Sequence, residues 1–489
     1  MLVGGLSWRR AFGCGESRMK QSKPLVDGQR KNQSRGVKHL LGGVAVSALL
    51  LSSPANAENL FDALAAAYHS NPGLQAERAG LRATDEQVPQ ALAGWRPSLT
   101  ASGSYGTVET DTDTAIPGAG GKSNYDPMTG SLVLSQNIFT GGRTLYGARR
   151  AESSVLAGRE NLRNAEQQTL LSAVTAYMDV VRDIAVVDLR GKNVEVLERQ
   201  LEASQDRFRV GEITRTDVAQ SEARLSGSQS NLIRAEATLI ASRAAYERVV
   251  GTAPGSLDQA PPLPAMPQSE AEAIDLSISS NPALEAARHA ERAAASAVSA
   301  AKGGLLPTVS VDASYQHAED PSGTVARSTT TQLLGTITIP LYQSGAQYSA
   351  IREAKHLESQ SRLQMADTQR QVQEAVRNAW EQLRATRAAI ASNREQVRAN
   401  EIALDGVRQE AQVGSRTTLD VLDAEQELLD SQVSLVGAER DEYVAGYSLL
   451  STVGQLSARD LGLAVDIYDP AENYDDVKHQ LVGWGTNDE

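Results

Sequence analysis

Two short segments combine a glycine with a threonine and an aspartate that are three residues apart. The segments are 210–218 and 413–421, and each contains Gly followed by Thr-x-x-Asp. This pattern resembles a helix break followed by a capping box, in which the two side chains satisfy backbone N–H groups of a new helix. Capping accounts for Asp217 and Asp420 but not for Asp423, three residues after Asp420 on the same helix face. Asp423 therefore needs another role, and Asp420 is able to serve both.

The other residues that commonly catalyse reactions or bind metals form no recognisable site. Gly118-Ala119-Gly120-Gly121 does not lead from a strand into a helix, which favours a flexible surface loop over a phosphate cradle. The single cysteine, Cys14, excludes an internal disulfide framework and a Cys-based zinc site. Five histidines lack metal-ligand spacing: His69, His289, His317, His356 and His479. We expect no catalytic residue, no metal and no cofactor, so an exported enzyme has no support.

The first 57 residues have the layout of a secretory signal. They carry nine Lys or Arg and two acids, and they end in the apolar stretch 40–51 and Ala55-Asn56-Ala57. A basic region, a short apolar region and an A-x-A site predict a signal peptide cleaved after Ala57. The basic region is long, so Met19 is a more ordinary start than Met1. The apolar stretch is too short for a membrane anchor.

Removing this signal makes the chain strongly acidic. It leaves 489 − 57 = 432 residues, with 47 − 9 = 38 basic and 60 − 2 = 58 acidic side chains, a charge near −20. This balance disfavours a nucleic-acid partner, which requires clustered Lys and Arg. No later apolar run reaches the roughly 18 residues of a membrane helix. The mature protein is therefore soluble outside the inner membrane or crosses an outer membrane as β-strands.

The mature sequence contains an internal repeat of two copies. Ser70-Asn71-Pro72 recurs at Ser280-Asn281-Pro282, a shift of 281 − 71 = 210, whereas Gly211 recurs at Gly414, a shift of 414 − 211 = 203. We place the seven-residue difference in the segment 106–130, which is longer than its counterpart 317–328, because surface loops tolerate insertions. Five prolines mark an extended linker between the copies: Pro254, Pro261, Pro262, Pro264 and Pro267. The expected division is a signal peptide (1–57), a first repeat (58–260), a second repeat (261–465) and an acidic C-terminal tail (466–489), solvated and partly disordered.

Each copy contains one pair of segments in which apolar and polar residues alternate. The segments are 99–105 and 131–138 in the first copy, and 308–315 and 333–341 in the second. Alternation predicts strands with one apolar face, so the chain contains four strands of about ten residues. Four strands cannot close a membrane barrel, which needs about eight, and an open edge in lipid leaves backbone groups unpaired. Any such barrel is shared between chains, and a conduit favours three chains with twelve strands.

Long helical segments without proline follow the strands in both copies. Apolar and small residues there recur every three or four positions, which is a heptad seam: Leu170, Val174, Tyr177, Val181 and Ile184; Leu232, Ala235, Leu239, Ser242, Tyr246 and Val249; and Val372, Val376, Ala379, Leu383, Thr386 and Ile390. Helices of roughly 65 residues at about 1.5 Å per residue are about 100 Å long. Heptads alone are equally typical of an ordinary coiled coil or filament, but a filament has no need of the duplicated hairpins.

Taken together, these features closely resemble the TolC-type outer-membrane factor family over nearly all of the mature chain. The resemblance is carried by the doubled Asn-Pro pairs, the doubled prolines Pro97 and Pro307, the turns 139–142 and 341–345, and above all the segment 413–424. It implies a homotrimer with a fold of the α plus membrane β-barrel class. In that fold, a long antiparallel coiled-coil tunnel lies in the periplasm of a Gram-negative bacterium and a twelve-stranded barrel lies in the outer membrane.

The resemblance also implies the partners and the cargo. Members are exit ducts that dock through a periplasmic adaptor onto an inner-membrane ABC or proton-driven transporter. They pass secreted protein (type I secretion) or drugs and other small toxic compounds. The acidic charge and the absence of a lipidated cysteine favour the general-purpose and type I branch. The alternative is a soluble periplasmic coiled-coil adaptor or filament protein; an adaptor, however, has one helical hairpin flanked by a lipoyl-like or barrel domain.

Functional residues follow from the same resemblance. An acidic ring at the periplasmic aperture maps to Asp420 and Asp423, where three copies place six carboxylates that favour cations. A latch that holds the aperture closed maps to Arg416 on one side and to Thr216 and Asp217 on the other. The family often has a tyrosine three residues before the glycine; Ala411 stands there, so one latch contact is expected to be missing.

Overall fold

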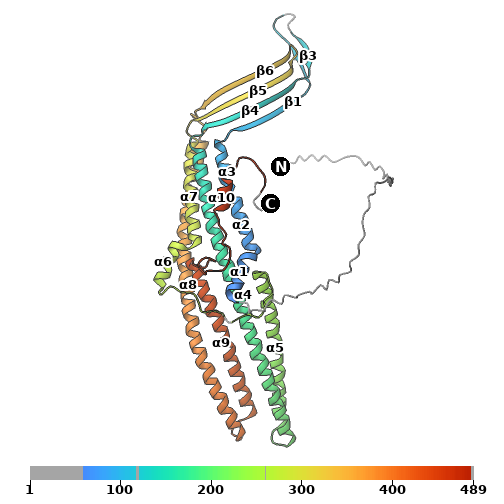
Figure 1. Cartoon of the computed structure of the whole chain (residues 1–489), viewed down its shortest axis with the longest axis vertical. Helices are drawn as coiled ribbons and strands as arrows, with labels where there is room; N and C mark the ends of the chain where they lie inside the picture. Colours follow the sequence, from blue (N-terminus) through green and yellow to red (C-terminus); the bar gives the residue numbers. More distant parts are fainter. Residues whose placement is uncertain (1–58, 117–119, 259, 486–489) are drawn as a thin grey trace, which may run out of the picture. The chain divides into compact units, whose positions relative to one another are not determined.

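A computed structural model describes residues 59–116, 120–258 and 260–485 (Figure 1). The expected signal peptide and its cleavage point after Ala57 lie outside the described residues. The described elements all belong to one compact unit, Ala55–Glu489. None of the helices in this part of the chain combines the length and the apolar character that a membrane crossing requires.

The order of elements repeats within the unit. The first copy runs α1 (Leu60–Ser70), α2 (Pro72–Asp85), α3 (Gln87–Leu92), a 3₁₀ turn η1 (Ala93–Trp95), β1 (Ser98–Tyr105), β2 (Val108–Thr112), β3 (Gly121–Tyr125), β4 (Met128–Phe139), α4 (Arg143–Arg209) and α5 (Arg215–Val250). The second runs α6 (Glu270–Ser280), α7 (Pro282–Gly303), β5 (Thr308–Ser322), β6 (Val325–Thr338), α8 (Ala346–Gln412) and α9 (Thr418–Val453), and a short α10 (Glu472–Val477) follows. Each copy is thus short helices, a hairpin and two long helices.

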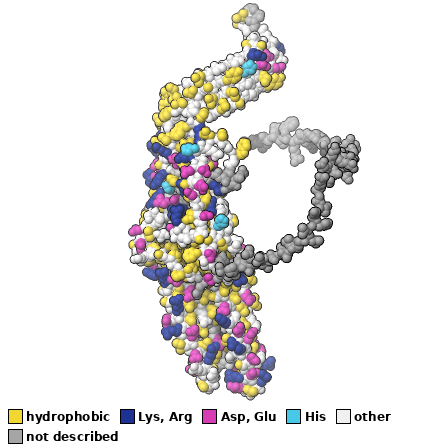
Figure 2. Space-filling view, in the orientation of Figure 1, with side chains coloured by type: hydrophobic (Ala, Val, Ile, Leu, Met, Phe, Trp, Pro, Cys, Tyr) yellow, Lys and Arg dark blue, Asp and Glu magenta, His cyan; other side chains and the backbone are white. Residues whose placement is uncertain are grey.

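The four predicted strands form one antiparallel sheet in the order β1-β4-β5-β6. The pairing of β4 with β5 joins the two copies. One cross-strand row contains Leu99, Leu134, Ala313 and Leu333, and the row shifted by one residue contains Thr100, Val133, Ser314 and Gln332. The predicted alternation therefore gives a largely apolar face and a polar face. Figure 2 shows hydrophobic side chains gathered over the sheet and charged side chains spread along the helices.

The first hairpin is longer than predicted because it carries a second, two-stranded sheet. β2 and β3 pair with each other, from Val108 opposite Tyr125 to Thr112 opposite Gly121. The expectation of a flexible loop at 118–121 is wrong for Gly121, which begins β3, and the prediction of four strands missed two more. Both strands are polar on both faces, so they lack the alternation that identifies a half-buried strand.

The register locates the seven-residue difference between the copies. Tyr105 pairs with Met128, which leaves 127 − 105 = 22 residues between them. The equivalent pair is Tyr315 and Thr331, with 330 − 315 = 15 residues between them. The difference, 22 − 15 = 7, lies in the first hairpin where it was predicted.

The long helices have the predicted length and seam. α4 and α8 each contain 67 residues, and α5 and α9 each contain 36. All six predicted seam residues of α8 are buried, from Val372 to Ile390. In α4 the seam holds at Leu170, Val174 and Tyr177, but Ile184 is 38% exposed. The largest core lies where α1 packs on α4 and α5, around Leu60, Tyr177 and Tyr246.

The doubled Ser-Asn-Pro motif joins short helices to long ones. Asn71 caps α2 through Gly73 N–H, while its own amide donates to the Val249 carbonyl at the end of α5 (3.0 Å). In the second copy Asn281 caps α7, and its amide donates to the Thr452 carbonyl of α9 (2.9 Å). Proline at the first helical position loses no hydrogen bond there. The motif therefore satisfies the beginning of one helix and the end of another.

The segment after α9 packs back onto the short helices. Arg96 donates to the carbonyls of Gln480 (2.9 Å) and Lys478 (3.3 Å), and Asn473 donates to Asp85 (2.9 Å). Val477 is 7% exposed. The expectation of partial disorder is therefore wrong for α10, whereas the expected solvation is confirmed for Glu472, Asp475 and Asp476 and for residues 481–485, which are exposed. Aromatic and apolar residues between the acids give this segment a face to bury.

Candidate channel entrance

The two turns that carry the candidate residues lie at the same end of the long helices (Figure 1). One joins α4 to α5 and the other joins α8 to α9. Gly211 and Gly414 have φ values of 81° and 80°. Such left-handed backbone favours glycine and ends each long helix. The next helix then begins four residues after the glycine, at Arg215 or Thr418.

Both predicted capping boxes are present. Thr417 donates its backbone N–H and its hydroxyl to the same Asp420 oxygen, each at 2.8 Å, and Asp420 N–H donates back to the hydroxyl at 3.2 Å. Thr214 and Asp217 make the same contacts in the first turn. The backbone N–H of each threonine, and then its hydroxyl, lower the pKa of the partner aspartate. The capping interpretation of Asp217 and Asp420 is confirmed.

Asp423 has a partner that sequence reasoning missed. Its carboxylate forms an ion pair with Arg224 of α5, 199 positions away in the chain. The two side chains are 50% and 41% exposed, so the pair lies in contact with solvent. It joins the α4–α5 hairpin to the α8–α9 hairpin. No spacing rule within one helix relates residues so far apart, and sequence periodicity gives no signal for the pair.

Arg416 pairs within its own turn rather than across to the other turn. Its Nε donates to Glu410 at 2.8 Å, and Glu410 raises the pKa of Arg416 further above its usual value. Thr216 and Asp217 lie on the α4–α5 turn, where Asp217 is engaged with Thr214. Among the described residues, Arg416 therefore makes no contact with its predicted latch partners.

An ion pair just above the second turn, between an exposed arginine and a buried glutamate, was also missed. Arg408 of α8 donates to Glu425 of α9 at 3.0 Å, and the Glu425 side chain is 6% exposed. The second Glu425 oxygen is buried without a partner in the described part of the chain. A buried charge of this kind costs free energy unless it is paired, so loss of Arg408 would leave the Glu425 carboxylate without its counter-ion.

Comparison with known proteins identifies the family. The model of the outer membrane efflux protein family matches residues 63–252 and 273–455, once in each copy. The outer membrane efflux protein BepC of Brucella suis is 39% identical over 442 residues, which is 90% of this chain and 95% of BepC. The chain therefore belongs to the outer membrane efflux protein family.

More distant relatives and solved structures agree. The outer membrane protein TolC of Escherichia coli is 26% identical over 86% of this chain and 87% of TolC. The alkaline protease secretion protein AprF of Pseudomonas aeruginosa is 27% identical over 85% of this chain and 88% of AprF. The Campylobacter jejuni outer membrane channel CmeC superposes with a TM-score of 0.73 at 16% identity, covering 86% of this chain and 89% of CmeC. CmeC therefore shares this fold.

The prediction of an export duct is confirmed by these comparisons. The chain is a TolC-type outer-membrane factor, located in the outer membrane with its helical tunnel in the periplasm. The family transports and does not catalyse. A soluble adaptor or filament is set aside, because the family model spans both copies of the repeat.

Proposed function

We propose that three copies of this chain form one duct, with their sheets joined in a twelve-stranded barrel. The sheet supports this proposal most directly. Its order leaves β1 and β6 as edges within the chain, and its largely apolar face includes Leu99 (70% exposed) and Leu333 (73% exposed). In lipid every backbone group must find a partner, so each edge pairs with the next chain. Three chains supply 3 × 4 = 12 strands and leave a lumen.

The duct receives cargo from an inner-membrane ABC or proton-driven transporter through a periplasmic adaptor. The names of the relatives support both cargo classes, since BepC is called an efflux protein and AprF a protease secretion protein. We propose that this chain serves small toxic compounds and secreted protein alike, as a general-purpose exit duct. Its own contribution to selectivity then lies at the periplasmic entrance.

At that entrance Asp420 and Asp423 of three chains form an acidic ring. Asp420 combines the cap with the ring, because a capping carboxylate keeps its negative charge. Arg224 partly neutralises Asp423. Asp420 therefore supplies most of the ring's net charge, and the ring favours cations.

The ring is tested by ion selectivity in planar bilayers. We expect the wild-type trimer to favour cations, and Asp420→Asn and Asp423→Asn each to reduce the ratio of cation to anion permeability, because each removes one negative charge per chain and the second also leaves Arg224 without a counter-charge. Glu353→Gln removes one charge near the other end of α8 and is the matched control. A channel that does not favour cations, or equal effects of Asp420→Asn and Glu353→Gln, would exclude the acidic ring. Chemical cross-linking of the same preparation tests the trimer separately.

Arg224→Gln tests the neutralising role of Arg224. Loss of the guanidinium leaves Asp423 without its counter-ion, so a trivalent cation added on the periplasmic side should block the channel at a lower concentration. The double variant Arg224→Gln with Asp423→Asn should lose this gain. If the trivalent cation blocks the Arg224→Gln channel at the same concentration as the wild-type channel, Arg224 does not regulate the charge of the ring.

A further inference from the structure

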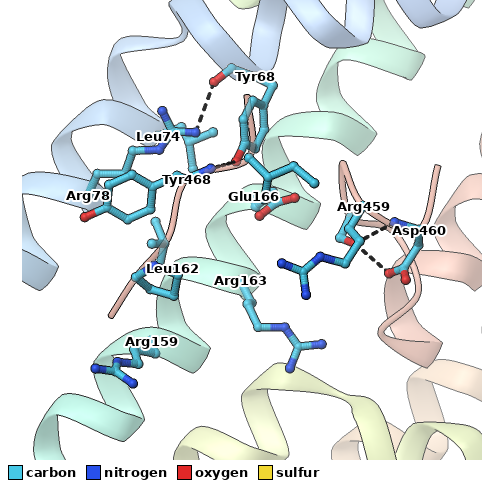
Figure 3. Close-up of a pocket in the computed structure, with 13 residues that line it drawn as sticks. Tyr68, Leu74, Arg78, Arg159, Leu162, Arg163, Glu166, Arg459, Asp460 and Tyr468 are labelled. Atoms are coloured by element: carbon cyan, nitrogen blue, oxygen red, sulfur yellow. Dashed lines mark hydrogen bonds between the residues drawn. The ribbon is translucent and has the colours of Figure 1, made fainter. Parts of the chain in front are cut away.

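A cavity of about 420 Å³ lies far from the turns, between α2, α4 and the segment that follows α9 (Figure 3). Its volume falls within the roughly 300–1,000 Å³ of small-molecule sites. Tyr68, Leu74 and Leu162 supply part of its apolar wall. The export pathway described above gives it no role.

The polar part of the wall is unusually rich in arginine. Arg78, Arg159, Arg163 and Arg459 line the cavity with Glu166 and Asp460, and Glu160 pairs with Arg163, a balance of 4 − 3 = +1. The mature chain as a whole carries 38 basic and 58 acidic side chains, or 38 − 58 = −20. A positive cavity on so acidic a protein concentrates anions locally, because low-dielectric walls focus the field of the cationic groups.

Two of the four guanidinium groups lack hydrogen-bond acceptors within the described residues. Arg459 has neither a hydrogen-bond nor an ion-pair partner there, and its side chain extends toward the same space as that of Arg163 (Figure 3). Arg159 lies over the Tyr474 ring, and its Nε is buried without an acceptor. A buried donor without a partner carries a desolvation cost that no hydrogen bond offsets. A ligand that supplies oxygen acceptors would remove that cost.

The remaining two arginines are held in place by neighbouring side chains and keep N–H donors that are not used in these contacts. Arg78 is 8% exposed and lies between the rings of Tyr68 (4.6 Å) and Tyr468 (5.1 Å). Arg163 uses one nitrogen to pair with Glu160 at 2.7 Å. An arginine carries five N–H donors, so this pair leaves others available. Preorganised guanidinium groups recognise planar and tetrahedral oxyanions well.

Both acids of the cavity are engaged with its wall. Glu166 accepts the Ala458 N–H at 2.7 Å, and Asp460 accepts the Ser457 hydroxyl at 2.6 Å. Burial raises the pKa of Glu166 above its ordinary value, as expected where water is partly excluded. Glu166 therefore fixes the segment after α9 against α4, and Asp460 stabilises a turn within that segment.

We propose that this cavity binds a small soluble oxyanion through phosphate or carboxylate groups, with Arg163 and Arg459 as its principal ligands. Arg163 lies 163 − 143 = 20 residues into α4, about 30 Å from the end next to the sheet at 1.5 Å per residue. That separation is too great for the headgroup of a lipid beside the strands. The ligand therefore reaches the cavity from the periplasm, and its binding would fasten the C-terminal segment to α4.

Isothermal titration calorimetry on the detergent-solubilised, assembled protein tests this proposal. The probes are inorganic phosphate and citrate, each compared with chloride at equal ionic strength. We expect one of them to bind with a Kd of about 1 mM or tighter. Arg459→Gln and Arg163→Gln should each weaken binding by about tenfold or more, since hydrogen bonds to charged groups have that effect.

Two further variants separate binding from structure. Glu166→Gln keeps an acceptor for Ala458 N–H but removes a negative charge, so it should tighten binding about threefold or more. Arg384→Gln, on the exposed part of α8, should leave binding unchanged. Absence of binding by both probes would overturn the proposal, as would equal affinities of wild type, Arg459→Gln and Arg163→Gln. Weaker binding by Glu166→Gln would overturn the assigned electrostatics.

Discussion

At the scale of single residues, the two turns separate local contacts from distant ones. Thr417 and Asp420 lie three residues apart, so their capping box was predictable from sequence. Arg224 and Asp423 lie 199 residues apart, and only the packing of one hairpin against the other brings them together. Sequence spacing therefore identified the acids of the entrance and missed Arg224, the cation that pairs with Asp423.

The capping contact of Asp420 should depend on pH. Its folded-state pKa is lowered by Thr417, so the cap contributes stability above the unfolded-state pKa of about 4. That contribution is lost as pH falls through the lower folded-state pKa. We expect the turn peptide 413–421 to lose hydrogen-exchange protection as the pH falls below about 4, after correction for intrinsic rates. Protection in Asp420→Asn should change less over that range.

Arg416 allows the latch to be tested against its local partner. If Arg416 holds a neighbouring chain through Asp217, Arg416→Ser should raise single-channel conductance, because the closed entrance loses a charge-assisted contact. Glu410→Gln removes the local partner and leaves Arg416 available, so it should not raise conductance. Equal increases in both variants would assign the effect to the 410–416 turn contact. An unchanged single-channel conductance in Arg416→Ser would exclude the latch hypothesis.

At the scale of elements, the sequence predicted those helices and strands whose buried face produces a periodic pattern of apolar residues. The α8 seam from Val372 to Ile390 is buried throughout, and the four alternating segments form one sheet. Periodicity failed where an element has no buried face to mark it. β2 and β3 are polar on both faces. Periodicity also missed α10, because Val477 is its one buried apolar residue among exposed acids.

The doubled Ser-Asn-Pro motif predicts equal effects in the two copies. Asn281→Ala removes the cap on α7 and the bond to the Thr452 carbonyl, and Asn71→Ala removes the matching pair. Each should weaken its junction by about 1–2 kcal/mol. Hydrogen exchange of the last turns of α9 and α5 measures this. Ser279→Ala, an exposed neighbour, is the control; similar exchange in the control and Asn281→Ala would contradict the assigned role.

At the scale of the whole molecule, a single chain is an incomplete unit. Its sheet has two edges and a largely apolar face that its own helices do not cover, since Leu99, Leu333 and Ile337 are each at least 67% exposed. This incompleteness was predictable from the sequence, because its four alternating segments are too few strands to close a barrel. It could not predict the pairing of β4 with β5, which makes the two copies one continuous sheet.

Leu333 and Gln332 test which face of that sheet meets lipid. They are adjacent on β6, and Leu333 belongs to the row of Leu134 and Ala313 while Gln332 belongs to the opposite face. An arginine facing lipid near the middle of the bilayer costs about 2–4 kcal/mol, and a trimer contains three of them. Leu333→Arg should therefore sharply reduce recovery in the outer-membrane fraction, whereas Gln332→Arg, which faces the lumen, should assemble normally. Normal recovery of Leu333→Arg would mean that the apolar face packs on protein, and the shared barrel would have to be abandoned.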